Sequence, residues 1–309
     1  MAFRIVTLGD LVADLTVLVR TLPLEIGQYQ EAHSIRIEPG GAGNFLITGS
    51  RLGMTMVAAG ALGDDAFGHA VGATLFTEGV HMELVCYPPH SITTAVLVLN
   101  DDAGNTIMIG AYGSGPALEY NSHWKEAINS ADAVFAFGYS LREFRIQSAV
   151  LEALEHAQSI GCPILFDPGP EFHLLESAVR ARALSTTQVL LLTDSELAIM
   201  GAGSPKELMH QDSIVVVKCG AAGCYILNEV GTITVPSYPV KVKDVAGAGD
   251  CFAAAFVYGY LSGWTLRRTA IFANATGAAK VQKRGTGRQA PNLDEVHAIL
   301  ANYEPSFNF

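Results

Sequence analysis

The sequence lacks the basic clusters that mark proteins binding nucleic acids. Its 309 residues include only 19 lysines and arginines against 30 aspartates and glutamates, which gives a formal net charge of −11. Affinity for a phosphate backbone comes from clustered basic side chains, so this balance argues against a nucleic-acid partner. A small solute is the expected partner instead.

Cysteines are few, and long apolar runs are missing. The five cysteines are an odd number and form no Cys-x-x-Cys pair, which suits free thiols in a reducing compartment. The longest apolar run, around Ala253 to Leu261, is less than half of the roughly 20 residues that cross a bilayer. No signal-peptide pattern precedes the first strand-like run. We therefore expect a cytoplasmic protein with no membrane partner.

Several site motifs are also missing. No Gly-Lys dipeptide occurs, which excludes a Walker A loop, and neither His-Arg-Asp nor Asp-Phe-Gly occurs. None of the nine histidines has the His-Glu-x-x-His spacing of a zinc site. The pattern Gly285-x-Gly287-x-x-Ala290 looks like a dinucleotide fingerprint, but no βαβ unit surrounds it and Pro291 interrupts it.

The sequence does contain short apolar runs that alternate with amphipathic helical stretches such as Arg145–Ile160. This alternation predicts an α/β fold with a parallel sheet covered on both faces. Half of the residues are apolar, so we expect one domain over residues 1–309. The predicted buried strands are Ile5–Leu8, Ala133–Phe137, Pro163–Phe166, Val189–Leu192 and Ile214–Val217.

Two regions, about 15–37 and 93–111, break this rhythm. They contain β-branched residues and turn signals without intervening helices. Neither region has enough apolar residues for a core of its own, so a sheet built from them must lie over the substrate site or another subunit.

The most informative segment is the glycine-rich turn that begins at Asp244 and passes into an apolar helix. Gly247 and Gly249 leave backbone amides open at a helix N-terminus, where free donors and the helix dipole favour an anion such as a phosphoryl group. Asp250, at the end of the turn, can accept the proton of an attacking hydroxyl. One loop thus predicts both an anion hole and a base.

A second glycine-rich segment is Pro39-Gly-Gly-Ala-Gly-Asn44. Its glycines allow close approach to a ligand, and the Asn44 amide offers a donor and an acceptor to adjacent hydroxyls. Asp14 follows the first strand, at the edge where open α/β sheets bind ligands.

These segments, in this order, resemble the ribokinase/PfkB family of kinases. Residues 244–257 resemble its second signature and the segment from Pro39 its first, although Leu46 stands where a small residue is usual. The resemblance implies a ribokinase-like, doubly wound, mostly parallel sheet with a small β-sheet lid. It implies Asp250 as catalytic base, with an anion hole of Gly247, Ala248 and Gly249. It implies substrate binding by Asp14, Gly40, Gly41 and Asn44.

Weaker similarities concern the cosubstrates, ATP and Mg²⁺. The ATP-binding residues that they imply are Lys218, Gly220, Gly223 and Asn274. Glu196 would act on magnesium through water, although Thr193 and Gly169 depart from the family pattern there. Members that use K⁺ would bind it at the carbonyls of Asp244 and Ala246. Residues 283–287 resemble a loop that closes over adenine.

The resemblance implies transfer of the γ-phosphoryl group of ATP to a hydroxyl, and a homodimer formed through the lid. Between Thr21 and Asn44 only Arg36 is basic, which favours an unphosphorylated sugar as substrate. A nucleoside is the alternative, because Tyr29, Tyr112 and Tyr139 are available for stacking. A further alternative is a catalytically silent pseudokinase that binds a ligand.

Overall fold

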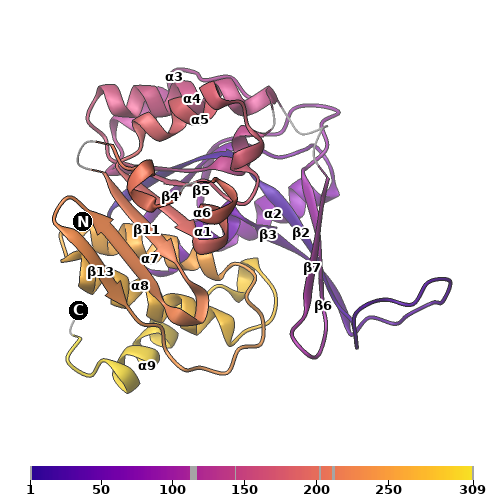
Figure 1. Ribbon diagram of the computed structural model, residues 1–309. Helices are drawn as coiled ribbons and strands as arrows, with labels where there is room; N and C mark the ends of the chain where they lie inside the picture. The colour runs from indigo at the N-terminus through magenta and orange to yellow at the C-terminus, as the bar shows by residue number, and fades with distance from the viewer. Residues whose placement is uncertain (1, 112–116, 143, 202, 211–212, 308–309) are drawn as a thin grey trace.

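A nine-stranded sheet runs through the computed structural model, which describes residues 2–111, 117–142, 144–201, 203–210 and 213–307 (Figure 1). In spatial order its strands are β13 (Gly231–Val235), β12 (Cys224–Asn228), β11 (Ile214–Lys218), β10 (Val189–Thr193), β9 (Ile164–Asp167), β8 (Ala133–Phe137), β1 (Arg4–Asp10), β4 (Thr55–Ala61) and β5 (His81–Cys86). Neighbours from β11 to β5 pair in parallel, while β12 and β13 pair antiparallel at one edge.

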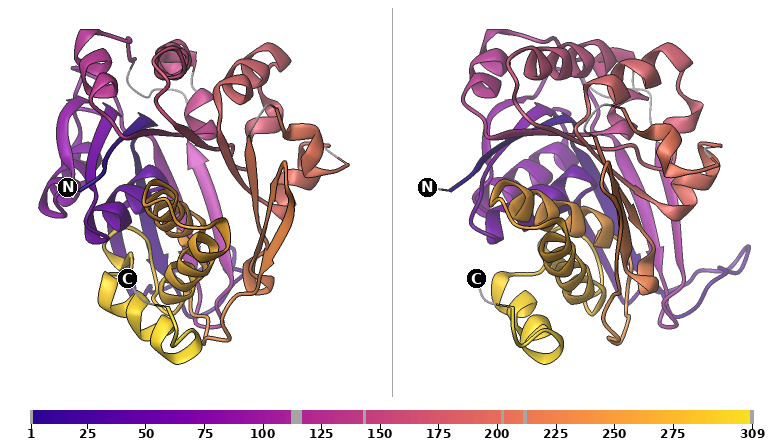
Figure 2. Two further views of the ribbon diagram at one scale, coloured as in Figure 1. Left: turned by 90° about the vertical axis from the view of Figure 1, so that its left-hand side faces the viewer. Right: turned by 60° about the vertical axis from the view of Figure 1, so that its left-hand side comes forward.

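Helices cover both faces of this sheet (Figure 2). One face packs against α1 (Ala42–Arg51), α2 (Ala66–Thr77), α7 (Ala248–Leu261), α8 (Leu266–Val281) and α9 (Leu293–Tyr303). The other packs against α3 (Ser122–Asn129), α4 (Phe144–Ser159), α5 (Ser177–Thr186) and α6 (Asp194–Ile199). The predicted doubly wound α/β fold is therefore confirmed.

The continuous apolar strands are explained by burial on both sides. In β8, Phe135 points to the α1 side and stacks on Phe45 with ring centroids 4.0 Å apart, while its neighbours Val134 and Ala136 belong to the opposite core. A strand covered on both faces needs no polar alternation. This is why such runs were recognisable in the sequence.

A separate four-stranded sheet forms the lid, which projects from one side of the body (Figure 1). Its order is β3 (Ser34–Gly40), β2 (Val12–Leu18), β6 (Ala95–Asn100) and β7 (Thr106–Ala111). The small lid sheet was predicted; its strand β2 begins earlier than expected and β3 continues to Gly40. None of the described helices is both long and apolar enough to span a bilayer.

The order of the strands determines where a ligand can bind. From β1 the chain moves to β4 and β5 on one side and later to β8, β9, β10 and β11 on the other. The carboxyl ends of strands beside such a reversal form a crevice in open α/β sheets. Asp10, Asp167 and Lys218 lie at the carboxyl ends of β1, β9 and β11.

Candidate active site

The glycine-rich turn presents backbone amides at the start of α7. Gly247 has φ of 76°, the left-handed region that glycine adopts most readily. The Ala248 amide, which was included in the predicted anion hole, donates to Val245 O at 3.1 Å within the turn itself. Among the described residues no acceptor is found for the amides of Gly247, Gly249 and Asp250. The open donors are therefore these three.

Asp250 is held in place by Asn44. The Asn44 Nδ2 group donates to Asp250 Oδ2 at 2.9 Å, and Asn44 Oδ1 accepts from the Gly287 amide at 2.7 Å. Burial raises the pKa of Asp250 to about 6, against the opposing effect of the Asn44 hydrogen bond. A side chain at Gly247 would begin 3.0 Å from the Asn44 amide, so glycine allows this close packing.

Lys218 brings a positive charge to the same turn. Its Nζ atom would lie 3.4 Å from a Cβ at Gly249, and it forms a buried ion pair with Asp167 Oδ2 at 2.6 Å. Burial lowers the pKa of Lys218, but the negative charges of Asp167, Glu196 and Asp250 outweigh this, so the pKa lies above its ordinary value. Lys218 is therefore an ammonium cation beside the open amides.

Asp14 and Glu38 form an acidic pair on the inner face of the lid. The two residues lie opposite each other in the β2–β3 register, and their side chains are 6% and 2% exposed. Burial raises the pKa of Asp14 to about 7; the Thr286 hydroxyl opposes this shift, and the charges of Asp250 and Glu38 add to it. A side chain at Gly40 would collide with the Asp14 carboxyl group.

The loop after α8 closes this side of the site. The Gly285 amide donates to Asp244 Oδ2 at 2.8 Å, and Arg288 pairs with Glu38 through Nη2 at 2.8 Å. Asp244 Oδ1 accepts from the Ala246 amide at 2.9 Å. The loop that was expected to close over adenine thus contacts the acceptor side and the anion-hole turn.

Of the predicted nucleotide-binding residues, Lys218, Gly220 and Gly223 lie at the end of β11 and in the turn to β12, whereas Asn274 lies on α8. Gly220 and Gly223 have φ of 53° and 93°, and a side chain at Gly223 would collide with Val235 O. The Asn274 Nδ2 group donates to the carbonyls of Val235 and Pro236, each at 3.1 Å. Asn274 therefore holds the end of β13, and contact with adenine stays a prediction.

Glu196 is used in a helix cap. Thr193 Oγ1 accepts from the Glu196 amide at 3.1 Å, and Glu196 Oε2 accepts from the Thr193 amide at 2.7 Å, a capping box at the start of α6. Burial, together with the charge of Asp167, raises the pKa of Glu196. Thr193, which departs from the family pattern, therefore positions the carboxylate.

The donor set fits a magnesium ion held through water. Asp167 and Glu196 supply the hard oxygen atoms that Mg²⁺ prefers, next to the lysine expected at the phosphates. In the part of the chain that the structure describes, no three His, Cys, Asp or Glu side chains form a cluster able to hold a metal directly. An ion that arrives with nucleotide phosphates needs no such cluster.

Two residues of the site, Glu38 and Thr286, were not named as binding residues from the sequence, and both flank Asp14. Tyr139, which was predicted only as a candidate for stacking, accepts a hydrogen bond through Oη from the Ala42 amide at 2.6 Å beside Gly41. Glu38 carried a detectable signal, because it precedes Pro39-Gly40 and pairing of two lid strands brings it opposite Asp14. Thr286 and Tyr139 lie in segments whose position depends on the tertiary fold. Tyr112, one of the candidate stacking residues, lies outside the described residues.

Comparison with known proteins decides the family. Residues 2–293 match the pfkB family of carbohydrate kinases. The chain belongs to this family. It is 29% identical over 300 residues to an ATP-dependent ribose-1-phosphate kinase of Halopiger xanaduensis, covering 96% of this chain and 98% of that protein. It is 28% identical to the ribokinase of Mus musculus, and the match covers 97% of this chain and 95% of that protein.

Comparison with solved structures agrees with this family assignment. An E. coli structure in complex with ATP and Mg²⁺ superposes with a TM-score of 0.84 at 22% identity, covering 98% of this chain and 100% of that one. The predictions of a ribokinase-like fold and of an ATP-dependent carbohydrate kinase are therefore confirmed.

The raised pKa of Asp14 leads to a prediction about stability. A carboxyl group whose pKa is higher in the folded state binds more protons there, so its contribution to stability falls as the pH rises from about 4 to about 7. Asp14→Asn removes this effect. We expect its melting temperature to exceed that of the wild type by about 5 °C at about pH 8, and by much less at about pH 4.

Calorimetry at both pH values checks this prediction. Glu119→Gln, at an exposed carboxyl group, serves as the control and should show the same small difference at both. A pH-independent effect of Asp14→Asn would contradict the shifted pKa.

Proposed function

We propose that this enzyme transfers the γ-phosphoryl group of ATP to a hydroxyl of a small unphosphorylated sugar, with Asp250 as the general base. One observation supports this most: Asp250 begins α7 beside open amides, its carboxylate held by Asn44 and a lysine next to it. A carboxylate with a pKa of about 6 is ionised at neutral pH yet basic enough to accept a hydroxyl proton.

Charge neutralisation is the other requirement of phosphoryl transfer. The amides of Gly247, Gly249 and Asp250 point fixed dipoles at the developing charge, and Lys218 adds a full positive charge from the side of β11. Magnesium that accompanies ATP screens the phosphates when bound, with Glu196 positioned to act through its water shell. Gly220 and Gly223 would let the nucleotide approach the backbone closely.

Asp14 and its neighbours would bind the sugar. Its carboxyl group lies against Gly40, and the Asn44 amide is bonded to Asp250, so a sugar hydroxyl placed here would donate to the carboxylate oxygen and accept from the amide nitrogen. The carboxyl groups of Asp14 and Glu38 place partial negative charge at this end of the site, which disfavours a substrate phosphate placed against it.

A sugar phosphate is nevertheless the second candidate, because one relative is named a ribose-1-phosphate kinase. A groove of about 100 Å³ on the inner face of the lid is lined by Arg36, Arg284 and Glu38. Arg284 pairs with Asp102 at 3.1 Å and Arg288 with Glu38, so acidic partners already balance part of this positive charge. This balance leads us to favour the free sugar.

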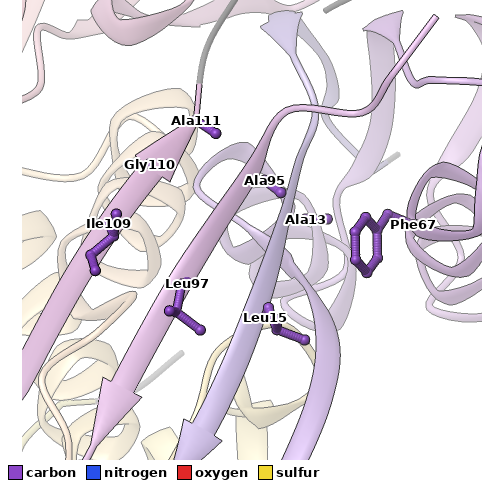
Figure 3. Close-up of a pocket in the computed structure, with 8 residues that line it drawn as sticks. All are labelled: Ala13, Leu15, Phe67, Ala95, Leu97, Ile109, Gly110 and Ala111. Carbon is purple, nitrogen blue, oxygen red and sulfur yellow. The ribbon is translucent and has the colours of Figure 1, made fainter. Parts of the chain in front are cut away.

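We further propose that two copies pair through the outer face of the lid. Strand alternation places Leu15, Leu97 and Ile109 on the face opposite Asp14, where with Phe67 of α2 they line an apolar hollow of about 260 Å³ (Figure 3). The Ile35 and Ile109 side chains there are 65% and 57% exposed. Contact with a second copy of the chain is more favourable for an apolar sheet face of this kind than exposure to water.

The anion-hole turn was also predicted to take potassium at the carbonyls of Asp244 and Ala246. Whether a potassium ion is needed there depends on the positive charge already packed behind the turn, which includes Lys280 of α8.

The proposed reaction can be tested by assays of activity. Assays of ADP release with free aldoses, ketoses, nucleosides and ribose 1-phosphate should give the highest kcat/KM for a free sugar. Asp250→Asn should lower kcat about 10³-fold because the base is lost, without lowering the melting temperature. Asp294→Asn, on exposed α9, is the matched control.

Three outcomes would count against the proposal. Full activity of Asp250→Asn would show that Asp250 is not the general base. A preference for ribose 1-phosphate would move the substrate to the second candidate class, and a preference for a nucleoside would favour the alternative.

The second prediction concerns pH. Since the base acts as a carboxylate and its pKa of about 6 is that of the free enzyme, kcat/KM for the sugar should fall below about pH 6. The Asn44 hydrogen bond lowers the pKa of Asp250, so Asn44→Leu should move this acid limb to higher pH by up to about one unit. Titration of ATP affects both proteins equally and cancels in the comparison. An unmoved limb would show that another group titrates.

The third prediction concerns assembly. Sedimentation at micromolar concentration should show a dimer, and Ile109→Asp should give monomers because a charge is placed in the apolar face. Ile160→Asp, at an exposed position after α4, should leave the dimer intact. A monomeric wild-type protein would refute pairing through the lid.

A further inference from the structure

A lysine is fully buried behind the anion-hole turn. Lys280, in the last turn of α8, has no exposed surface, and its Nζ atom has no hydrogen-bond partner among the described residues. An isolated buried ammonium group costs several kcal/mol. Such a group persists only where other charges compensate it, so negative charges are expected close to Lys280.

The position of Lys280 follows from its helix. Gly277, one turn earlier on the same face of α8, would place a Cβ 3.8 Å from the Ala248 carbonyl oxygen. Val281, the next residue, accepts hydrogen bonds from the amides of Lys243 and Asp244 at 2.7 and 3.3 Å. The end of α8 is thus packed directly against the turn that leads to Asp250.

The charges around this turn are mostly negative. Asp244 is 2% exposed, and Asp14 interacts electrostatically with both Asp244 and Asp250. Burial lowers the pKa of Lys280 and the charge of Lys283 adds to this, while Cys251, Asp244 and Asp250 act in the opposite direction. Burial also raises the pKa of the Cys251 thiol to about 12, so that thiol stays neutral at physiological pH. The two aspartates are therefore the negative charges that compensate Lys280.

Two lysines flank the turn from opposite sides. Lys218 reaches Gly249 from β11, where the phosphoryl group is proposed to lie, whereas Lys280 approaches from the protein interior. A carboxylate cluster that receives a polyphosphate would repel it unless positive charge is supplied nearby. Lys280 is fully buried and can supply this charge without occupying the site, whereas the neighbouring Lys283 is paired with Glu295 at 3.0 Å.

We propose that the Lys280 ammonium group is a built-in counter-ion behind the anion hole, which supplies the positive charge that a monovalent cation would otherwise bring. This inference rests on the proposed kinase function. Lysine is suited to the role because its ammonium is a compact point charge. It acts through Asp244 and the turn, as a positioning residue. It follows that the enzyme works without potassium.

Exchange of the salt tests this proposal. The kcat of the wild type should agree within about twofold in about 0.1 M KCl and in choline chloride at the same ionic strength. Lys280→Ala should lose about 100-fold in choline, and KCl should restore most of the loss by filling the vacated space. Lys125→Met, an exposed lysine on α3, should show neither effect.

Stability separates this role from simple packing. Lys280→Met keeps the length of the side chain and removes a buried charge, so its melting temperature in choline should equal or exceed that of the wild type while its kcat falls. Without any substrate, KCl should raise the melting temperature of Lys280→Ala by about 2 °C relative to choline, and that of the wild type not at all.

Several results would overturn the proposal. They are a tenfold or greater dependence of the wild type on K⁺ (about 1.4 kcal/mol), full activity of both lysine variants in choline, or a loss that KCl does not restore. If the wild type phosphorylates no compound, the proposed function fails, and the substrate-free melting temperatures still decide the role of Lys280. If Lys280→Ala does not fold, Lys280→Met in both salts and the wild type decide it.

Discussion

The hydrogen bond from Asn44 to Asp250 joins residues 206 positions apart in the chain. Through its oxygen the same amide group also binds Gly287, so one planar side chain connects α1, the start of α7 and the loop after α8. Each of these segments contributes to the site only while the others are in place. The arrangement of acceptor pocket, anion hole and closing loop therefore depends on this one amide.

Negative charge is the main constraint on the site. Burial raises the pKa of both Asp14 and Asp250, which means that both carboxylates lower the stability of the fold at neutral pH. The protein offsets this with paired cations, Lys218 with Asp167 and Arg288 with Glu38. A kinase site of the proposed kind needs a carboxylate as base and must also receive phosphates. It therefore retains the buried carboxylates in spite of their cost in stability.

The two faces of the lid differ in chemical character. Register pairs Asp14 with Glu38 on the inner face, while Leu15, Leu97 and Ile109 form the apolar outer face. Successive side chains alternate between the faces of a strand, so a few strands can close the site and offer an association surface at once. Substrate binding and assembly would then be coupled through a thin sheet.

The sequence by itself determined the family and the chemical elements of the site. Apolar runs such as Ala133–Phe137 predicted strands because burial on both faces leaves an unmistakable pattern. The turn before Asp250 predicted an anion hole because glycines before a helix leave amides open. The lid segments were recognisable because hairpins without helices broke the alternation.

Only the tertiary structure decided which donors and charges meet. The Ala248 amide is used within its own turn, Glu196 closes a helix cap with Thr193, and the Gly285 amide donates to Asp244. These outcomes depend on local hydrogen-bond geometry and on contacts between distant segments, which spacing along the chain does not encode. Lys280 is the clearest case. In the sequence it is one lysine near the end of a helix, and only packing of α8 on α7 removes it from water and places it near Asp244 and Asp250.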